Sequence, residues 1–333
     1  MATYKEIFGT NIEVLASDPA NPVEGQVWYN STNNVVKGAA VTTVGSWATG
    51  TAVNLARTGG SGSPYGTQAA ALFVGGYAGA GSGQGNTEQW NGSSWTELND
   101  LNQARYDIGG AGTSTSNLVF GGESDPTGRV ALTESWNGTS WTEVSDLNTA
   151  RQKPGGTGVS NTSALAFGGY NPPSLYAITE SWNGSSWTEV NDLNQARAYP
   201  GGAGTVTSAL AAGGNLFDLS PSISNSAETW DGTSWTTITN LNTARADLKG
   251  AGADNTSVLI ISGNVNNTEL WNGSSWVEQN DTSNFHNAGA PSGASSTSAL
   301  IISGSNPGIP SRITAVEEWT GAGSPLTVTF TDS

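Results

Sequence analysis

The stretch Trp90-Asn91-Gly92-Ser93-Ser94-Trp95 decides the fold of this 333-residue chain, because near copies of it recur along the sequence. The copies occupy 90–95, 136–141, 182–187, 230–235 and 271–276, with Asp231 in place of asparagine in the fourth. Their starts are 46, 46, 48 and 41 residues apart. A repeat of this length indicates a propeller or a solenoid and replaces a division into two unrelated domains.

Each repeat contains four short runs of strand-forming residues, which are clearest in 105–150. A glycine-rich run at 109–113 is followed by an apolar run at 118–122, a run ending in Trp136 and a run beginning with Trp141. The Asn-Gly pair between the two tryptophans supplies the positive φ that tight hairpins need. Four strands in a repeat of this length are typical of one propeller blade.

An arginine and a glutamate recur once in every repeat. We interpret each pair as a structural bond between blades or between a strand and a loop, because arginine and carboxylate form bidentate hydrogen bonds. The alternative is a ring of charges that binds a ligand. The arginines are Arg57, Arg105, Arg151, Arg197 and Arg245, with His286 in the sixth place. The glutamates are Glu88, Glu134, Glu180, Glu228 and Glu269, with Glu317 or Glu318 last.

The two ends of the repeat array complement one another. The last unit has a third strand ending at Trp319 but lacks a fourth, whereas Ser46-Trp47 precedes Arg57 by the same interval that separates Trp95 from Arg105. We therefore predict that 45–50 closes an all-β, six-bladed propeller with four antiparallel strands per blade. Residues 326–330 are the competing candidate. The expected domain is 45–333, with blades at 57–104, 105–150, 151–196, 197–244, 245–286 and 287–321 plus 45–56.

Composition excludes several classes of function. A net charge of −16 disfavours nucleic acid and anionic membrane surfaces as partners. The chain has no cysteine, so disulfides, thiolate metal sites and cysteine nucleophiles are excluded, and we expect no cofactor or metal. Nothing approaches a membrane-spanning apolar run, and the first residues do not resemble a signal peptide. We expect synthesis in a cytoplasm without membrane insertion.

Two resemblances suggest an identity for the chain. The double glycines, third-strand aromatic and fourth-strand tryptophan of 45–321 resemble the kelch repeat. Pro22-Val-Glu-Gly-Gln-Val-Trp-Tyr-Asn30, followed by Lys37, resembles a short module of bacteriophage tail and fibre proteins. That resemblance implies a small hairpin in segment 1–44, with strands at 26–30 and 34–37, that attaches the chain to a particle through Val27, Trp28 and Tyr29. The alternative is an extra hairpin packed on the propeller.

The tryptophan pairs and the variable loops are the main candidates for binding. We interpret the pairs as filling between blades and not as sugar-stacking platforms, because five similar copies recur. They are Trp90, Trp95, Trp136, Trp141, Trp182, Trp187, Trp230, Trp235, Trp271 and Trp276. The loops between second and third strands should emerge on one face beside the arginine-bearing connections, where binding residues are common. They carry the candidates Tyr77, Tyr170, Tyr176, Leu216, Phe217 and Ile309.

The whole layout is similar to virion proteins of marine bacteriophages. It implies a non-enzymatic tail- or fibre-associated protein whose loop face binds a host-surface glycan or other virion proteins, with a second copy of the chain as a further candidate partner. His286 stands in the arginine register, so we assign no catalytic residue. One alternative is a capsid decoration protein without a receptor role. Another is a glycan-processing enzyme, which needs clustered, non-repeating carboxylates that the sequence does not reveal.

Overall fold

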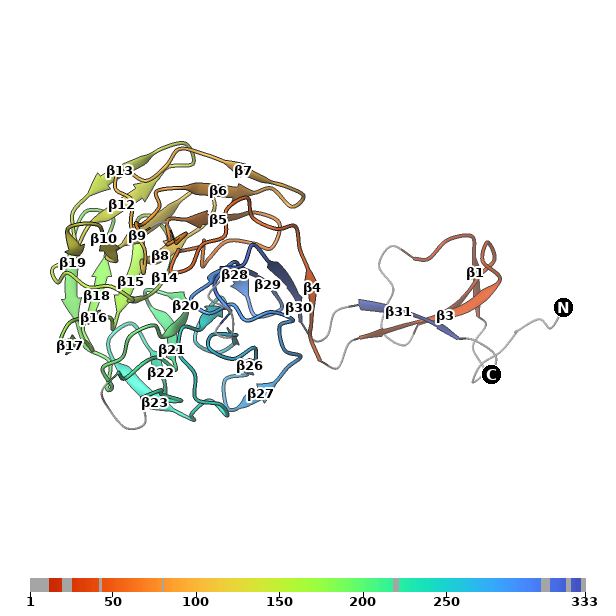
Figure 1. Ribbon diagram of the computed structural model, residues 1–333. Coiled ribbons are helices and arrows are strands. Elements are labelled where there is room, and N and C mark those ends of the chain that lie inside the picture. Colours follow the sequence, from red (N-terminus) through yellow and green to blue (C-terminus); the bar gives the residue numbers. More distant parts are fainter. Residues whose placement is uncertain are drawn as a thin grey trace. The chain divides into compact units, whose positions relative to one another are not determined.

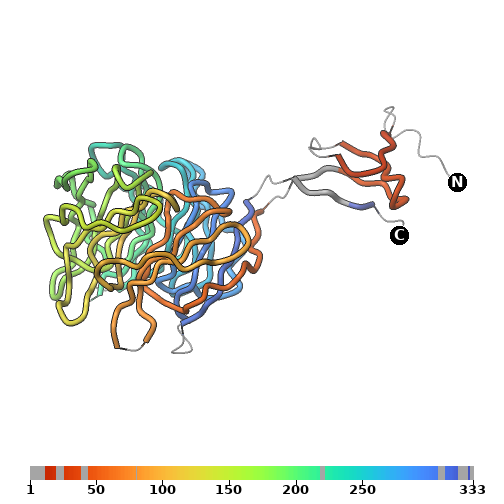
Figure 2. Tube along the Cα trace, turned by 90° about the horizontal axis from the view of Figure 1, so that it is seen from above, coloured from red at the N-terminus to blue at the C-terminus, as the bar shows by residue number. Residues whose placement is uncertain are grey.

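The structure, a computed structural model, describes residues 12–19, 26–41, 44–79, 81–217, 222–306, 312–321 and 325–330. These residues form strands and turns, with no helix among them. The chain divides into two compact units (Figure 2). The larger unit is Ser46–Trp319, and the smaller unit joins Met1–Gly45 to Thr320–Ser333.

The larger unit repeats one antiparallel sheet. A representative sheet contains β8 (Gly109–Gly112), β9 (Asn117–Phe120), β12 (Thr133–Trp136) and β13 (Trp141–Val144). Two small ribbons, β10 (Glu123–Ser124) with β11 (Gly128–Arg129) and β16 (Tyr170–Asn171) with β17 (Ser174–Leu175), lie in loops. The next three sheets are β14 (Gly155–Ser160), β15 (Ser163–Phe167), β18 (Thr179–Trp182) and β19 (Trp187–Val190); β20 (Gly201–Thr205), β21 (Ser208–Ala212), β22 (Ala227–Trp230) and β23 (Trp235–Ile238); and β24 (Lys249–Ala251), β25 (Val258–Ile261), β26 (Thr268–Trp271) and β27 (Trp276–Glu278).

The sheets of the larger unit are arranged around a common centre (Figure 1). The first strands β8, β14, β20, β24 and β28 (Ala290–Ser295) contact one another in that order, and β28 also contacts β5 (Ala71–Val74). β5 forms a three-stranded sheet with β6 (Thr87–Trp90) and β7 (Trp95–Glu97). The described residues therefore form an all-β, β-propeller-like fold.

The recurring six-residue phrase forms the hairpin between the third and fourth strands. In the second copy, Trp136 pairs with Trp141, and their ring centroids are 5.2 Å apart. The N–H groups of Thr139 and Ser140 both donate to Asn137 Oδ1 at 2.9 Å. Gly138 has a φ of 93°, a value that residues with a side chain rarely adopt. The prediction that Asn-Gly forms a turn is confirmed.

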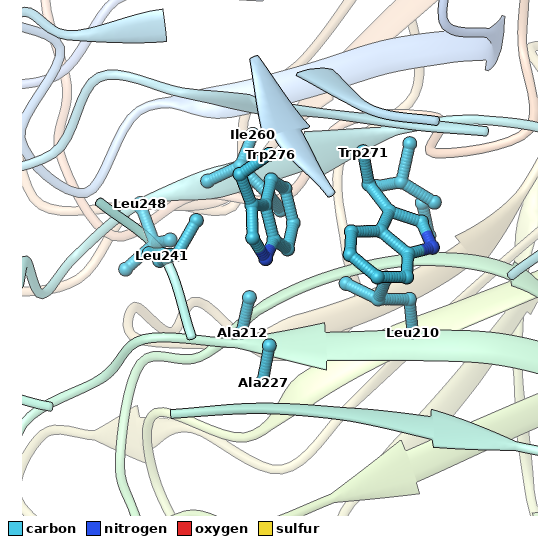
Figure 3. Close-up of a cluster of buried hydrophobic side chains, with 10 residues drawn as sticks. Leu210, Ala212, Ala227, Leu241, Leu248, Ile260, Trp271 and Trp276 are labelled. Atoms are coloured by element: carbon cyan, nitrogen blue, oxygen red, sulfur yellow. The ribbon is translucent and has the colours of Figure 1, made fainter. Parts of the chain in front are cut away.

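The tryptophan pairs pack between neighbouring sheets, as predicted. Figure 3 shows Trp271 and Trp276 of one sheet with Leu210, Ala212 and Ala227 of the preceding one. The indole N–H of the second tryptophan also reaches the preceding sheet, for example from Trp187 to Thr133 Oγ1 at 3.1 Å. Burying a side chain of this size contributes about 2–3 kcal/mol, so the pairs are a main source of cohesion between sheets.

The chain ends supply strands to two different sheets. β4 (Ser46–Thr49) lies beside β30 (Val316–Thr320) in the sheet with β28 and β29 (Ser298–Ile302). Residues 46–49 thus take the fourth position that the repeat predicts. Trp47 lies 5.1 Å from Trp319 between ring centroids and donates to Thr268 Oγ1 at 3.0 Å.

The competing segment 326–330 pairs elsewhere. It lies in β31 (Pro325–Phe330), which pairs antiparallel with β3 (Val35–Val41), and the order of the smaller sheet is β1 (Glu13–Leu15), β2 (Val27–Asn30), β3, β31. The predicted hairpin is present as β2 and β3 but belongs to a four-stranded sheet. The expected domain boundary at 45–333 therefore differs from the structure, because 320–333 belongs to the smaller unit. A lone hairpin is marginally stable, and the added strands extend its pairing.

Candidate functional site

Five buried Arg–Glu ion pairs and one buried His–Glu contact fix the connections that lead into the sheets of the larger unit. Every repeated arginine is 0% exposed and pairs with a glutamate of the sheet that follows it, in the strand that leads into the tryptophan hairpin. The structural interpretation of these pairs is confirmed, and Glu317 is the sixth glutamate. The N–O distances are 3.0 Å for Arg57–Glu88, 3.2 Å for Arg105–Glu134, 2.6 Å for Arg151–Glu180, 2.9 Å for Arg245–Glu269 and 3.0 Å for His286–Glu317, and Arg197 bonds Glu228.

The same glutamates hold the backbone ahead of the arginine. Glu180 Oε2 accepts hydrogen bonds from the main-chain N–H of Asn148 at 2.7 Å and from its side-chain amide at 2.8 Å. Glu180 Oε1 accepts from Arg151 Nη1. Both ends of the 148–151 connection are therefore tied to one carboxylate, which fixes where the residues after Arg151 emerge.

Two positions after each arginine or histidine, the backbone adopts a left-handed conformation. We call these six residues the central ring. Hydrogen bonds link neighbours within it: Lys153 N–H donates to Asp107 O at 2.7 Å, Tyr199 N–H to Lys153 O at 2.9 Å, and Gly59 N–H to Ala288 O at 2.8 Å. The φ values are 68° for Gly59, 56° for Asp107, 60° for Lys153, 52° for Tyr199, 61° for Asp247 and 49° for Ala288.

The side chains of the central ring differ chemically although their backbone positions repeat. Asp107, Lys153, Tyr199 and Asp247 are all half-buried. The Tyr199 hydroxyl donates to Asp107 Oδ1. Lys153 Nζ lies 3.8 Å from Asp107 Oδ2 and 4.6 Å from the centroid of the Tyr199 ring. Asp247 Oδ2 accepts a hydrogen bond from the Asn287 amide at 3.2 Å.

Lys249 adds a fifth polar side chain to this cluster. It occupies a position that the other repeats fill with small residues, namely Ser61, Gly109, Gly155, Gly201 and Ala290. Its Nζ lies 6.0 Å from the centroid of the Tyr199 ring, and it lines a central cavity of about 30 Å³. The other lining residues are glycine, proline, serine and isoleucine. A cavity of this size holds about one water molecule.

The titratable groups of this cluster have perturbed pKa values. Burial raises the pKa of Asp107, and it raises the pKa of Asp247 to about 6, although the nearby Lys153 opposes both shifts. Burial also lowers the pKa of Lys249 and raises that of Tyr199 well above its ordinary value. Several perturbed groups in one place are a physical indication of a functional site.

The variable loops lie beside the arginine-bearing connections, as the sequence predicts. Isolated bridges join Gln152 to Tyr170 and Ala198 to Asn215, and the same arrangement recurs in other repeats. Tyr170 and Phe217 meet with ring centroids 4.2 Å apart, and Lys153 Nζ lies 5.5 Å from the Phe217 ring. Two of the predicted binding residues are thus brought together at the cluster.

The other predicted loop residues lie apart from this pair. Tyr77 contacts Tyr106 at 5.3 Å between ring centroids, and the Arg312 guanidinium lies 4.5 Å from the Tyr77 ring. Tyr176 is half-buried and donates its backbone N–H to Gly169. Leu216 is only 5% exposed, so most of its side chain is packed in the core. Ile309 lies outside the described residues.

The predicted attachment residues sit in the smaller sheet. Trp28 is fully buried and its indole N–H donates to Asp18 Oδ1 at 3.1 Å, so it stabilises this unit and offers no surface for contact. Val27 and Tyr29 are half-buried. Hydrogen bonding from Lys37 is the largest cause that lowers the pKa of Asp18 to about 2.

Sequence reasoning missed Asp107, Lys153, Tyr199, Asp247 and Lys249. The signal for them is a change of side chain within the repeat: aligned on the arginine or histidine, the second following residue reads Gly, Asp, Lys, Tyr, Asp and Ala, and the fourth reads Ser, Gly, Gly, Gly, Lys and Ala. These positions do not stand out in the repeat pattern, because their side chains change from one repeat to the next.

Comparison with known proteins adds no family to this description. No protein-family model matches the chain, and no curated protein does either. Across the ranges that the structure describes, no set of three or more metal-binding side chains is grouped to hold an ion. The same ranges contain no helix long and apolar enough to cross a membrane.

Proposed function

We propose that the larger unit is a six-bladed β-propeller closed by β4. Three observations support this. Six repeated sheets occur in the described residues, β4 lies beside β30 in the last of them, and β28 contacts β5 of the first. The hydrogen bond from Gly59 to Ala288 and that from Ile108 to Gly59 O also link the first repeat to both the last and the second. Closure leaves no free sheet edge and joins the two ends of the array.

On this scaffold we propose a non-enzymatic binding protein of a bacteriophage virion, tail- or fibre-associated, with a host-surface glycan or another virion protein as ligand. The binding role is carried by one observation: Asp107, Lys153, Tyr199 and Asp247 differ from one another at a position where the backbone repeats. Residues that vary on a rigid repeated framework are where recognition resides. The virion role is supported by the resemblance of 22–30 to tail and fibre modules.

Locating the chain on particles tests the virion role. Mass spectrometry of purified phage should detect it in stoichiometric amounts, and cryo-microscopy should place it on the tail or its fibres. Its absence from particles purified away from cell lysate would refute the virion role. A position on the capsid shell would instead identify a decoration protein, which is the alternative that the sequence allows.

One observation favours a second candidate, a glycan-processing enzyme. Asp107 and Asp247 lie in one cluster and do not belong to the repeated glutamates. Such an enzyme needs carboxylates of this kind, and the sequence alone did not reveal them. Burial raises the pKa of both side chains. A carboxyl with a raised pKa is suited to donate a proton to a glycosidic oxygen. Release of reducing ends from glycans, abolished by Asp107→Asn or Asp247→Asn, would establish this activity, and its absence would leave binding as the function.

A further inference from the structure

We infer that the cluster at the central ring binds one uncharged sugar residue, with its hydroxyls on Asp107, Asp247, Lys153 and Lys249 and a C–H face on the Tyr170–Phe217 pair. This inference rests on the proposed binding role of the same face and adds the chemical class of the ligand. It follows from the size of the cavity, the balance of charges and the position of the aromatic pair.

The size of the central cavity places the ligand above it. About 30 Å³ is room for one water molecule and far less than a sugar needs. Lys153, Tyr199 and Asp247 are half-buried and do not line that cavity, whereas Pro154 and Pro200, which follow two of them, and Lys249 do. A ligand as large as a sugar ring therefore contacts the ring side chains from outside.

The charges of the cluster favour a neutral ligand. Two acidic side chains, Asp107 and Asp247, stand with two basic ones, Lys153 and Lys249, so the formal charges of the cluster cancel. An anionic ligand would meet both carboxylates and the field of a chain whose net charge is −16, and a cationic ligand would meet both ammonium groups. A hydroxyl group donates and accepts, so it can use a carboxylate and an ammonium group together.

The two lysines have free hydrogen-bonding capacity for such hydroxyls. Lys153 Nζ is 3.8 Å from its nearest carboxylate oxygen, which exceeds a hydrogen bond, and it contacts the Tyr199 ring instead. Lys249 Nζ likewise lies over the Tyr199 ring. Tyr199 is itself held by the bond from its hydroxyl to Asp107. We assign Tyr199 as a positioning residue, since its hydroxyl and a ring face are already engaged.

An apolar platform adjoins these polar groups. Tyr170 and Phe217 stack at 4.2 Å with 33° between their planes, both are half-buried, and Phe217 is the neighbour of Lys153. Sugars present a C–H face beside a rim of hydroxyls, and aromatic side chains bind that face. A half-exposed aromatic pair next to paired donors and acceptors therefore matches one sugar ring.

A matched series of probes tests the ligand class on the full chain. Saturation-transfer NMR would compare glucose, galactose, mannose and N-acetylglucosamine with glucuronate and glucosamine, which add one negative or one positive charge to the same ring. We expect at least one neutral sugar to bind, with the charged analogues roughly tenfold weaker. Stronger binding of glucuronate or glucosamine than of every neutral sugar would overturn the assignment.

Two variants test the site. Asp107→Asn keeps the side-chain shape, and Lys249→Gly restores the residue that three other repeats carry at this position. Each should weaken neutral-sugar binding roughly tenfold or more, because each removes a charged hydrogen-bond partner. Glu189→Gln, which removes a charge from the exposed outer strand β19, is the control and should bind as the parent does. Circular dichroism confirms that the variants are folded.

The outcomes separate this inference from the proposed function. Sugar binding that survives both variants unchanged places the ligand elsewhere and overturns the site. A chain that is found on particles but binds no sugar overturns the inference and leaves the virion role intact. A chain that binds neutral sugar at this cluster but is absent from particles supports the inference and refutes the virion role.

Discussion

Replacing Arg151 with methionine tests whether the buried ion pairs hold the repeats together. Arg151 Nη1 lies 2.6 Å from Glu180 Oε1, and both side chains are 0% exposed. Methionine retains much of the volume but removes the charge and the hydrogen bonds. Glu180 then keeps its bonds to Asn148 through Oε2 and loses the arginine donor to Oε1.

The expected cost is large because a charge remains buried without its partner. Breaking one buried pair in this way costs about 3–5 kcal/mol, a sizeable share of a domain's stability of about 5–15 kcal/mol. Adding Glu180→Gln removes the stranded charge while leaving a carbonyl oxygen for the Asn148 N–H. We therefore expect the double variant to recover about 2 kcal/mol relative to Arg151→Met alone.

Urea unfolding followed by tryptophan fluorescence measures both variants, and hydrogen exchange of residues 148–151 tests whether this connection loosens first. The control is Arg129→Met, since Arg129 lies 3.6 Å from Glu123 and is 33% exposed. That pair should contribute less than about 1 kcal/mol. The reasoning is refuted if Arg151→Met costs no more than Arg129→Met, or if the double variant is no more stable than the single one.

Three further predictions concern the ring, the last sheet and the turns. Asp247 has a pKa of about 6 in the folded chain and near 3.8 ordinarily. Its contribution to the free energy of unfolding is therefore fully present below about pH 4 and is lost as pH rises through 6. Asp247→Asn should therefore gain about 2 kcal/mol relative to the parent between pH 4 and 7 in urea titrations, and equal pH profiles would contradict this. Trp47→Ala should cost about 3 kcal/mol and raise hydrogen exchange in β4, because it removes the contact with Trp319; unchanged melting would show that β4 adds little. Asn137→Asp should melt like the parent at pH 7, since Asp231 serves in the fourth copy, whereas Asn137→Ala should lose about 1 kcal/mol.

The repeated parts of the fold could be predicted from sequence because their chemistry is local. The Asn-Gly turn between Trp136 and Trp141 specifies a hairpin within six residues, wherever it occurs. The position of β4 was also predictable, since Trp47 stands at the same distance from Arg57 as Trp95 does from Arg105. In each case comparison with the five complete copies showed which position of the repeat each residue occupies, and a single stretch of sequence could not show this.

The partner of β31 could not be predicted in this way. Residues 326–330 alternate apolar and polar side chains as an ordinary strand does, and no copy of them occurs in the repeat. Strand propensity says that a segment pairs but not with what. Lys37 pairs with Thr329, which lies near the other end of the sequence, and no local feature of either segment specifies that register.

The central ring explains why the candidate cluster escapes the sequence pattern, and its backbone conformation bears on the proposed binding role. Its backbone conformation favours glycine, and Gly59 satisfies it without strain. Asp107, Lys153, Tyr199 and Asp247 adopt it with full side chains, at a cost of about 1 kcal/mol or more each. Glycine occupies many other positive-φ positions of this fold, and it would relieve the strain at these four positions as well. Ala288 of the same ring and the buried Ser262 and Ser303 also adopt a positive φ, so the strain by itself does not mark a site. The argument for binding is that the four strained ring residues with polar side chains gather in one cluster, where Tyr199 bonds Asp107 and Lys153 lies beside both.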